Sequence, residues 1–509
     1  MRTKILAIAV FMGFLNAGAQ DIYQIERVTS EDLSGTARFV GMGGSMSALG
    51  ADISTMSTNP AGTGLFFKPE VSASMSVSSL SKGSTFDDIG KTRASFDQIG
   101  FIYPFKMGEH SSLKYLNFGF NYHKRKNLHM LVNADQALNG ESQTWQMADV
   151  ASFWGGTDKG SPLTEAGYQT FLYDKTGTQD DAGYDQYNVY NATRGTYNKA
   201  MTGSIQAYDF NTSLNIDNQF FVGLTVGVYN VDFSSYSEYT EQLSGAGHYT
   251  LSNDRSLSGT GVDFKLGAIV YPFYDYTFRF GFSFSSPTYY SLTENCNSLI
   301  LSNINGTDYD YRTRVGNHDY NIRTPWKFNV SAGGTLGDFL ALNAEYEYSD
   351  YSTANVSYDN WDDSWGWGGS STKDRELNRQ TAKYLNGVST IRLGVEGEVS
   401  SWSIRAGYNY VSSPIKSKAF LNQFINSASL DYSTSTSYMN LGDINRFTCG
   451  LGFHERHFFM DLAYMYQTQS GKFYAFSTQQ GNDAVVNEAP VSKINLDKSK
   501  FMFTLGYVF

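Results

Sequence analysis

The clearest pattern in the chain is an alternation of apolar and polar residues, which recurs from residue 69 to the C-terminus. In the last segment, five apolar residues occupy every second position: Phe501, Phe503, Leu505, Tyr507 and Phe509. Further upstream, Phe, Leu, Ile and Tyr alternate in the same way with Arg, Glu, Asn and Gly, as in 278–284, 340–348, 391–396 and 404–410. A period of two over such lengths predicts β-strands with one apolar and one polar face.

We predict 14 such strands along the chain. Their approximate bounds are 69–82, 93–106, 112–126, 200–216, 218–239, 249–272, 275–293, 321–336, 338–357, 383–399, 401–414, 441–454, 457–475 and 493–509. Short turns such as 336–339 and 399–402 alternate with long connections such as 126–199 and 352–383. An even number of strands brings both ends of the sheet to the same side of a membrane.

Two features favour a membrane barrel over a soluble β-sandwich, which would also alternate. The polar faces carry charges and glycine, while Tyr and Phe end the apolar faces, as in a wet lumen and a lipid face with aromatic girdles. Short turns at one end and long loops at the other are the usual asymmetry of such barrels. Because backbone groups in lipid must all be paired, the sheet has to close. We therefore predict an all-β fold, a 14-stranded antiparallel barrel in the outer membrane of a Gram-negative bacterium.

The composition of the 509 residues excludes several other classes of protein. A membrane-spanning helix needs about 20 consecutive apolar residues, and the longest apolar stretch here is 5–15. Two cysteines exclude a disulfide scaffold and a multi-cysteine metal site. The net charge of −11 argues against nucleic acid as a partner.

The first 19 residues have the order of a cleaved secretory signal. Two basic residues, Arg2 and Lys4, precede the apolar stretch, and Ala17-Gly18-Ala19 follows it. A buried N-terminal helix is the alternative, and the small-residue ending argues against it. We predict a signal peptide over 1–19, an N-terminal lumenal hatch over 20–68 and the barrel with its long outer loops over 69–509.

Residues 20–68 do not alternate, yet they are too apolar and too weakly charged for a disordered tail. A barrel of this strand number has a lumen that its own side chains cannot fill, so a compact segment before it is a natural plug. Asp52 is placed to cap one helical turn through Met56, and the chain should leave helical geometry at Asn59 before Pro60. A periplasmic linker is the alternative on composition alone.

This segment also resembles a known family. The stretches Ala-Arg-Phe-Val-Gly-Met-Gly-Gly-Ser (37–45), Ala-Leu-Gly-Ala-Asp (48–52) and Asn-Pro-Ala-Gly (59–62) are similar to the N-terminal hatch of FadL-type outer-membrane transporters. The matching hatch positions are Gly41, Gly43, Gly44, Asp52, Asn59, Pro60, Ala61 and Gly62. Outside the hatch, the resemblance extends only to the 14 strands and the terminal Phe509. It does not reach the ligand contacts in the long loops.

The resemblance implies passive, hatch-gated transport of a hydrophobic small molecule, such as a long-chain fatty acid or a lipid-like compound. Two alternatives stay open: a haemin receptor, a label that relatives of this type often carry, and a non-transport scaffold for protein secretion or surface assembly. We expect a monomer surrounded by outer-membrane lipid, assembled by the barrel-assembly machinery through Phe509.

We expect the ligand to sit in an apolar pocket between hatch and wall. The candidate residues along its path are Met56, Phe66, Phe67, Arg279, Arg392 and Arg405. An inward arginine is suited to a substrate carboxylate. The alternative role of these arginines is to pair with Glu345, Glu347, Glu396 and Asp461 across the lumen and hold the hatch.

No motif in the chain indicates catalysis, a cofactor or a metal site. The glycines at 41–44 lack the third glycine of a dinucleotide loop, because Met46 occupies its place. The chain contains no Gly-x-Ser-x-Gly, phosphate loop or His-Glu-x-x-His sequence. The acidic clusters at 359–367 and 180–185 do not have the spacing of a calcium loop. We therefore expect no enzyme, cofactor or bound metal.

Overall fold

A computed structural model describes residues 22–108, 111–158, 161–179, 183, 185–273, 277–313, 316–337, 339–360, 370–416, 438–477, 479–480 and 485–509. The predicted signal peptide over 1–19 and most of the acidic clusters at 359–367 and 180–185 lie outside these ranges. Within them, no helix is both long and apolar enough to cross a membrane.

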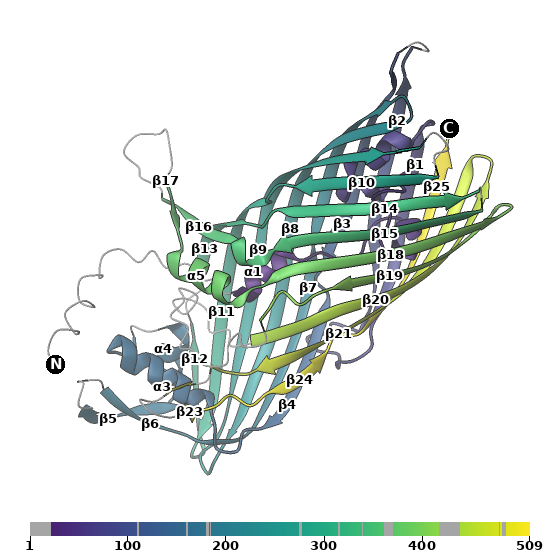
Figure 1. Ribbon diagram of the computed structural model, residues 1–509. Helices are drawn as coiled ribbons and strands as arrows, with labels where there is room; N and C mark the ends of the chain where they lie inside the picture. Colours follow the sequence, from purple (N-terminus) through teal and green to yellow (C-terminus); the bar gives the residue numbers. More distant parts are fainter. Residues whose placement is uncertain are drawn as a thin grey trace.

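The chain forms a closed antiparallel barrel of 14 strand positions, as the alternation predicts (Figure 1). In order around the barrel, the strands are β1 (Glu70–Leu80), β2 (Thr92–Lys106), β3 (Leu113–Asn127), β7 (Ala192–Ile216), β8 (Phe220–Leu243), β9 (Gly247–Val270), β10 (Phe278–Ser285), β14 (Lys327–Leu336), β15 (Leu340–Asp350), β18 (Gly387–Val399), β19 (Trp402–Val411), β20 (Tyr438–Glu455), β21 (Phe458–Tyr474) and β25 (Lys498–Val508). The first and last strands close it, with Glu70 opposite Val508 and Leu80 opposite Lys498.

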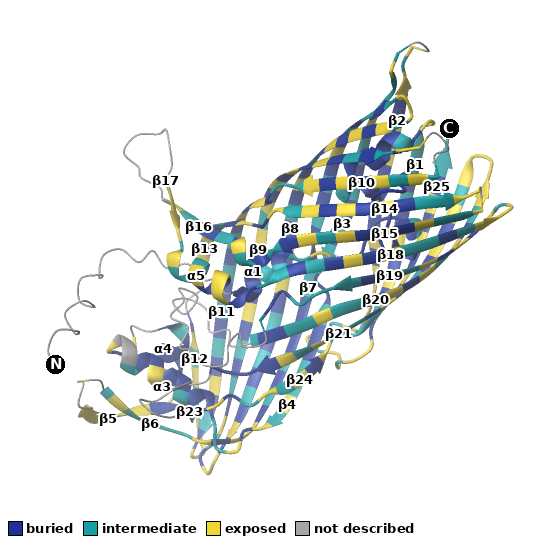
Figure 2. Ribbon diagram, in the orientation of Figure 1, coloured by how far each residue is buried: buried dark blue, intermediate teal, exposed yellow. Residues whose placement is uncertain are grey.

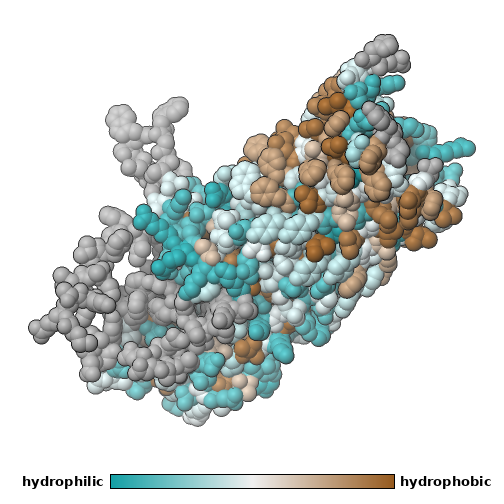
Figure 3. All heavy atoms as spheres, viewed as in Figure 1, coloured by the Kyte–Doolittle hydropathy of each residue, from teal (hydrophilic) through white to brown (hydrophobic). Residues whose placement is uncertain are grey.

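The alternation in sequence becomes an alternation of faces in the barrel wall. Figure 2 shows buried and exposed residues following one another along the strands. On β10, for example, Phe278, Phe280, Phe282 and Phe284 are exposed. Figure 3 shows apolar side chains gathered around the half of the barrel that carries the C-terminus. This half is the membrane belt, and the other half extends beyond it.

Two neighbouring strand lines are interrupted at the same level of the wall. β10 is continued after Pro287 by β11 (Tyr289–Ile304), and β13 (Gly316–Arg323) is followed after Pro325 by β14. Each break contains a proline, which cannot donate to a ladder. Thr288 and Thr324 rejoin the two lines, since each backbone N–H bonds to the other residue, at 2.8 and 3.0 Å. Sequence reasoning predicted one uninterrupted strand over 275–293.

The long connections fold into a cap at the outer end of the barrel, which the alternation did not predict. Its elements are β4 (Met130–Ala137), α3 (Gln143–Trp154), α4 (Pro162–Gln169), β5 (Tyr173–Gln179), β6 (Asp185–Val189), β12 (Thr307–Arg312), η3 (Tyr351–Thr353), β16 (Asn355–Asn360), β17 (Ser370–Lys373), α5 (Arg375–Tyr384), β22 (Gln479–Gln480), β23 (Val485–Asn487) and β24 (Ser492–Asn495). The helices α3 and α4 pack in an apolar cluster against the outer parts of β7, β8, β9, β11 and β21.

A buried carboxylate fixes α3 to the wall. Glu241 on β8 accepts hydrogen bonds from Ser142 Oγ at 2.6 Å, Gln143 N at 2.9 Å and Tyr239 O–H at 2.6 Å. Gln143 N belongs to the first turn of α3, so the wall carboxylate accepts from a backbone N–H that has no partner within the helix.

We expect Glu241→Ala to loosen the cap while the barrel stays closed. A buried donor without a partner costs about 1–3 kcal/mol, so hydrogen exchange in residues 143–152 should quicken by more than about tenfold. Glu238→Ala is the matched control, because Glu238 lies on the other face of β8 and, among the described residues, accepts a hydrogen bond from Tyr236 O–H at 2.7 Å. Equal exchange in both variants would contradict the assigned role of Glu241.

Residues 22–66 lie inside the barrel. They form α1 (Ile22–Thr29), α2 (Ala37–Gly41), η1 (Ile53–Ser57) and η2 (Pro60–Leu65). Figure 1 shows α1 further toward the cap than the other purple helical turns, which lie near the end that carries the C-terminus. We call residues 33–68 the hatch segment. Nearly all of its side chains up to Phe66 are buried.

Candidate functional site

Three short helices of the hatch segment are each started by a polar side chain. Thr36 Oγ1 accepts from Phe39 N at 3.1 Å, and Asp52 accepts from Ser54 N at 2.8 Å. Asn59 accepts from Ala61 N at 3.2 Å, with Pro60 at the first position of the turn. The capping role predicted for Asp52 and the change of geometry at Asn59 are therefore confirmed. Thr36 Oγ1 also donates to Asp52 at 2.7 Å, which links the first helix to the second.

The glycine-rich motif lets the hatch segment turn tightly against the wall. Gly43 and Gly44 have φ of 67° and 77°, in the left-handed region that glycine tolerates best. The carbonyl oxygens of Gly41 and Gly43 accept from Thr448 Oγ1 at 2.9 Å and Asn409 Nδ2 at 3.3 Å. Gly62 O accepts from Ala51 N at 3.0 Å, which closes the segment on itself. The motif therefore shapes the hatch segment and offers no ligand site of its own.

The wall is shaped to receive the hatch segment by glycines on its inner face. On nine strands, a Cβ added at one inward glycine would meet hatch atoms: Gly100, Gly119, Gly223, Gly267, Gly281, Gly333, Gly394, Gly407 and Gly450. A Cβ at Gly407 would overlap the backbone of Met42 and Gly43, and one at Gly223 would overlap the backbone of Pro60. We call this set the glycine girdle. It allows the hatch backbone to approach the wall more closely than any other residue would.

A buried charge cluster joins the hatch segment to the wall. Arg38 donates to both oxygens of Glu396 at 2.9 and 2.6 Å and to Ala51 O at 2.8 Å. Arg405, whose side chain is fully buried, pairs with the same Glu396 and with Asp461. Cations and anions thus alternate in this cluster, in the order Arg38, Glu396, Arg405 and Asp461. Charges that are buried away from water need such partners.

The candidate path residues are spread over different parts of the lumen. Met56 and Phe66 pack with Ile53 and Ile102 in a small apolar cluster on one side of the hatch segment. Phe67 is 52 % exposed and contacts the ring of Tyr115.

The three candidate arginines are equally dispersed. Arg279 donates to Leu49 O at 2.8 Å and lies over the ring of Tyr271. Arg405 belongs to the charge cluster, and of the three only Arg392 lines the cavity beside the hatch segment.

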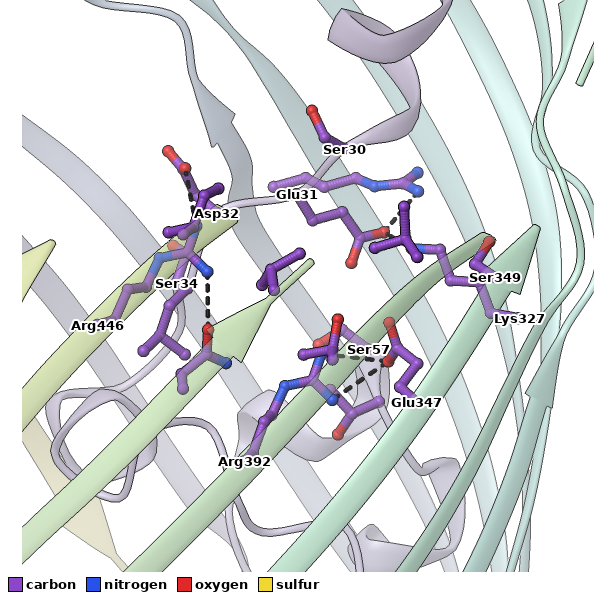
Figure 4. Close-up of a pocket in the computed structure, with 18 of the residues that line it drawn as sticks. Ser30, Glu31, Asp32, Ser34, Ser57, Lys327, Glu347, Ser349, Arg392 and Arg446 are labelled. Carbon is purple, nitrogen blue, oxygen red and sulfur yellow. Dashed lines mark hydrogen bonds and ion pairs between the residues drawn. The ribbon is translucent and has the colours of Figure 1, made fainter. Parts of the chain in front are cut away.

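That cavity lies between the hatch segment, the wall and the chain that leads to α1. Its volume is about 100 Å³, and charged or hydroxyl side chains dominate its lining. Arg392 pairs with Glu345. It also pairs with Glu347 at 3.2 Å (Figure 4). The space beside the hatch segment is therefore polar, whereas the sequence led us to expect an apolar pocket.

Two adjacent carboxylates of the N-terminal segment face this cavity from within. Glu31 pairs with Arg125, at 2.5 Å, and with Lys327, while Asp32 lies 3.8 Å from Arg446 and 3.5 Å from Lys498. Burial raises the pKa of Asp32, but the two cations outweigh burial and lower the pKa to about 2. Burial likewise opposes Arg125 and Lys327 at Glu31, and the cations hold its pKa well below the ordinary value. Both carboxylates are therefore ionised at neutral pH.

An apolar cluster lies further out in the lumen, and α1 packs within it. Ile22, Tyr23, Ile25 and Val28 are buried there. The residues around them come from the wall and the cap: Met201, Ile205, Tyr229, Val231, Phe233, Leu257, Tyr290, Leu292, Tyr320, Ile322, Tyr351, Leu377, Tyr384, Leu385, Val388 and Ile415. We call the site formed by these residues around α1 the apolar chamber.

The cations that meet Glu31 and Asp32 were not predicted as site residues from the sequence. Arg125 follows Gly119 and His123 on the polar face of β3, so the alternation already indicated that it points inward. Arg446 and Lys498 lie on inward positions of β20 and β25 in the same way. The pattern gives the face of each residue, but their convergence on Glu31 and Asp32 depends on the closed barrel.

Comparison with known proteins identifies the fold. No protein-family model and no curated protein matches the chain. Among solved structures, a FadL homologue of Pseudomonas aeruginosa aligns with 94 % of this chain and 99 % of its own, with a TM-score of 0.53 and 11 % sequence identity. This chain has a FadL-type fold. The toluene transporter TbuX of Ralstonia pickettii also aligns, over 94 % of this chain and 99 % of its own, with a TM-score of 0.49 and 12 % identity.

The FadL-type fold and the apolar belt place the protein in an outer membrane. The exposed apolar residues surround the wall at one level, and every strand of the closed sheet pairs on both sides there. Residues 33–66 of this FadL-type barrel lie inside the wall. Within the described ranges, no cluster of three or more metal-binding side chains is found.

Proposed function

We propose that this protein is a passive outer-membrane transporter of hydrophobic small molecules, with long-chain fatty acids as its substrate class. The observation that carries the proposal is the pairing of an apolar chamber with a charged cavity inside one barrel. An apolar tail fits the first and a carboxylate fits the second. The FadL-type fold supports the same function, and it favours a transporter over an enzyme.

The hatch segment supplies the gate in this proposal. Hydrogen bonds, ion pairs and close packing against the glycine girdle hold it in place, in addition to its chain connection to β1. Such non-covalent contacts can break and re-form as a substrate passes. The sequence contains no nucleotide-binding motif, so we infer that concentration and consumption inside the cell drive uptake.

Uptake measurements in cells test this function. We expect a strain without the gene to take up labelled palmitate several-fold more slowly than the parent, and a plasmid copy to restore the rate. Labelled haemin is measured in parallel, because the alternative of a haemin receptor predicts the opposite selectivity.

Each outcome separates the candidate functions. Loss of haemin uptake alone would replace fatty acid by haemin as the substrate. Equal uptake of both compounds in all strains would contradict transport, and protein partners that copurify in fixed ratio would then favour the secretion scaffold.

A further inference from the structure

The helix α1 occupies the apolar chamber as a bound molecule would. Its apolar side chains are buried among residues from the wall and the cap. Its polar groups reach specific partners: Tyr23 O–H donates to Asn440 at 2.8 Å, and Gln24 donates to Tyr320 O–H at 3.0 Å. Arg27 lies over the ring of Phe233, at 5.0 Å. The chamber is therefore filled by the protein's own chain.

The residues after α1 place two negative charges among wall cations. Figure 4 shows Glu31 near Lys327 and Asp32 near Arg446. The four cations that meet these carboxylates belong to four different strands, β3, β14, β20 and β25: Arg125, Lys327, Arg446 and Lys498. The segment 22–32 thus combines an apolar body with an anionic end.

The cations cannot leave with the segment, because they belong to the barrel wall. The side chains of Arg125 and Arg446 are 5 % and 2 % exposed. Buried cations that lose their counterions are strongly destabilising. Asp263 lies 4.0 Å from Arg125, but it also serves Lys265 at 3.2 Å, so it does not replace Glu31. Departure of the segment is therefore costly unless another anion arrives.

We propose that residues 22–32 are an internal substitute for an anionic amphipath, and that the chamber becomes available only by exchange of counterions. An incoming molecule must bring an apolar part for the chamber and an acidic group for the four cations. A neutral hydrocarbon of the same size satisfies the first requirement and leaves the second unmet. This inference rests on the proposed transport function and names the property that selects its substrate.

Gly35 gives the segment a place to turn. It lies between the two carboxylates and α2, has φ of 144° and packs against Ser54 of the hatch segment. The hatch segment beyond it is fixed independently by Arg38 and Glu396. Residues 22–32 can therefore leave the chamber while the hatch segment stays in the glycine girdle.

The test is hydrogen exchange in α1, measured on the full protein in nanodiscs of zwitterionic phospholipid. We expect palmitate to quicken exchange of residues 22–29 by about tenfold. Hexadecanol, which has the same tail without the charge, and sulfate, which has the charge without a tail, should leave the rate unchanged.

A variant without the two negative charges tests the release of residues 22–32 in the absence of a ligand. We expect Glu31→Gln with Asp32→Asn to quicken exchange in α1 before any addition. Asp87→Asn with Asp88→Asn is the matched control, since Asp87 and Asp88 are adjacent, exposed carboxylates on the connection between β1 and β2. The control should behave like the unaltered protein.

Three results would overturn the proposal: equal effects of palmitate and hexadecanol, no effect of palmitate, or slow exchange in the charge-removed variant. The palmitate comparison uses the unaltered chain, so it remains decisive if the variant does not fold. Uptake is scored separately. Palmitate uptake without faster hydrogen exchange in α1 would refute the substitute role alone. Faster hydrogen exchange without palmitate uptake would refute transport alone.

Discussion

Gly407→Leu should convert a sealed barrel into a leaky one. The new side chain points into the lumen, where even a Cβ overlaps the backbone of Met42 and Gly43. Overpacking against side chains typically costs about 1–3 kcal/mol, and backbone atoms yield less readily. The hatch segment must therefore shift away from β19. We expect single-channel conductance in planar bilayers to rise several-fold above that of the unaltered protein.

The neighbouring residue provides the control for this prediction. Ala406 is the adjacent residue on β19, and it faces the lipid. Ala406→Leu adds a similar volume there and should leave conductance unchanged. A barrel without residues 22–60 sets the upper limit of conductance. If Gly407→Leu stays as closed as Ala406→Leu, the hatch segment does not seal the lumen.

Arg405→Met should produce the largest loss of stability. Its guanidinium is completely buried and serves two carboxylates, Glu396 and Asp461. Removing one partner of a buried ion pair typically costs about 3–5 kcal/mol, because the remaining charge loses its partner. We expect the folded, fast-migrating band on a denaturing gel to disappear at a clearly lower urea concentration.

Neutralising Asp461 distinguishes charge from packing. Asp461→Asn, added to Arg405→Met, removes the carboxylate left without a cation and keeps its volume, while Glu396 retains Arg38. This double variant should recover much of the lost stability. Equal stability of Arg405→Met and the unaltered barrel would show that water reaches this cluster.

The alternation was sufficient to predict the wall, because lipid and lumen impose opposite demands on neighbouring residues. It predicted the outward Phe278 and Phe280 and the inward Arg279 from their order alone. It also gave the number of strand positions. The breaks at Pro287 and Pro325 were missed, although each proline was visible, because their partners lie on neighbouring strand lines.

The candidate site was less accessible from sequence, because it consists of contacts between distant residues. The caps at Asp52 and Asn59 are local, and the sequence indicated them correctly. The pairing of Glu31 with Arg125 and Lys327 spans strands that meet only after the barrel closes. The amphipathic α1 contains no signal for its position, since its apolar residues fit equally well against any apolar surface. The polar cavity depends on the same closure.

The glycine girdle also constrains the order in which the protein assembles. It engages the hatch segment from nine strands around the lumen, and at Gly223, Gly281, Gly394 and Gly407 an added Cβ would overlap hatch backbone atoms. Such a fit is difficult to reach by inserting the segment into a closed wall. We therefore expect the wall to close around a hatch segment that is already in place, with pairing of β1 and β25 as the final step. The hatch segment would then act as a template for the strands that surround it.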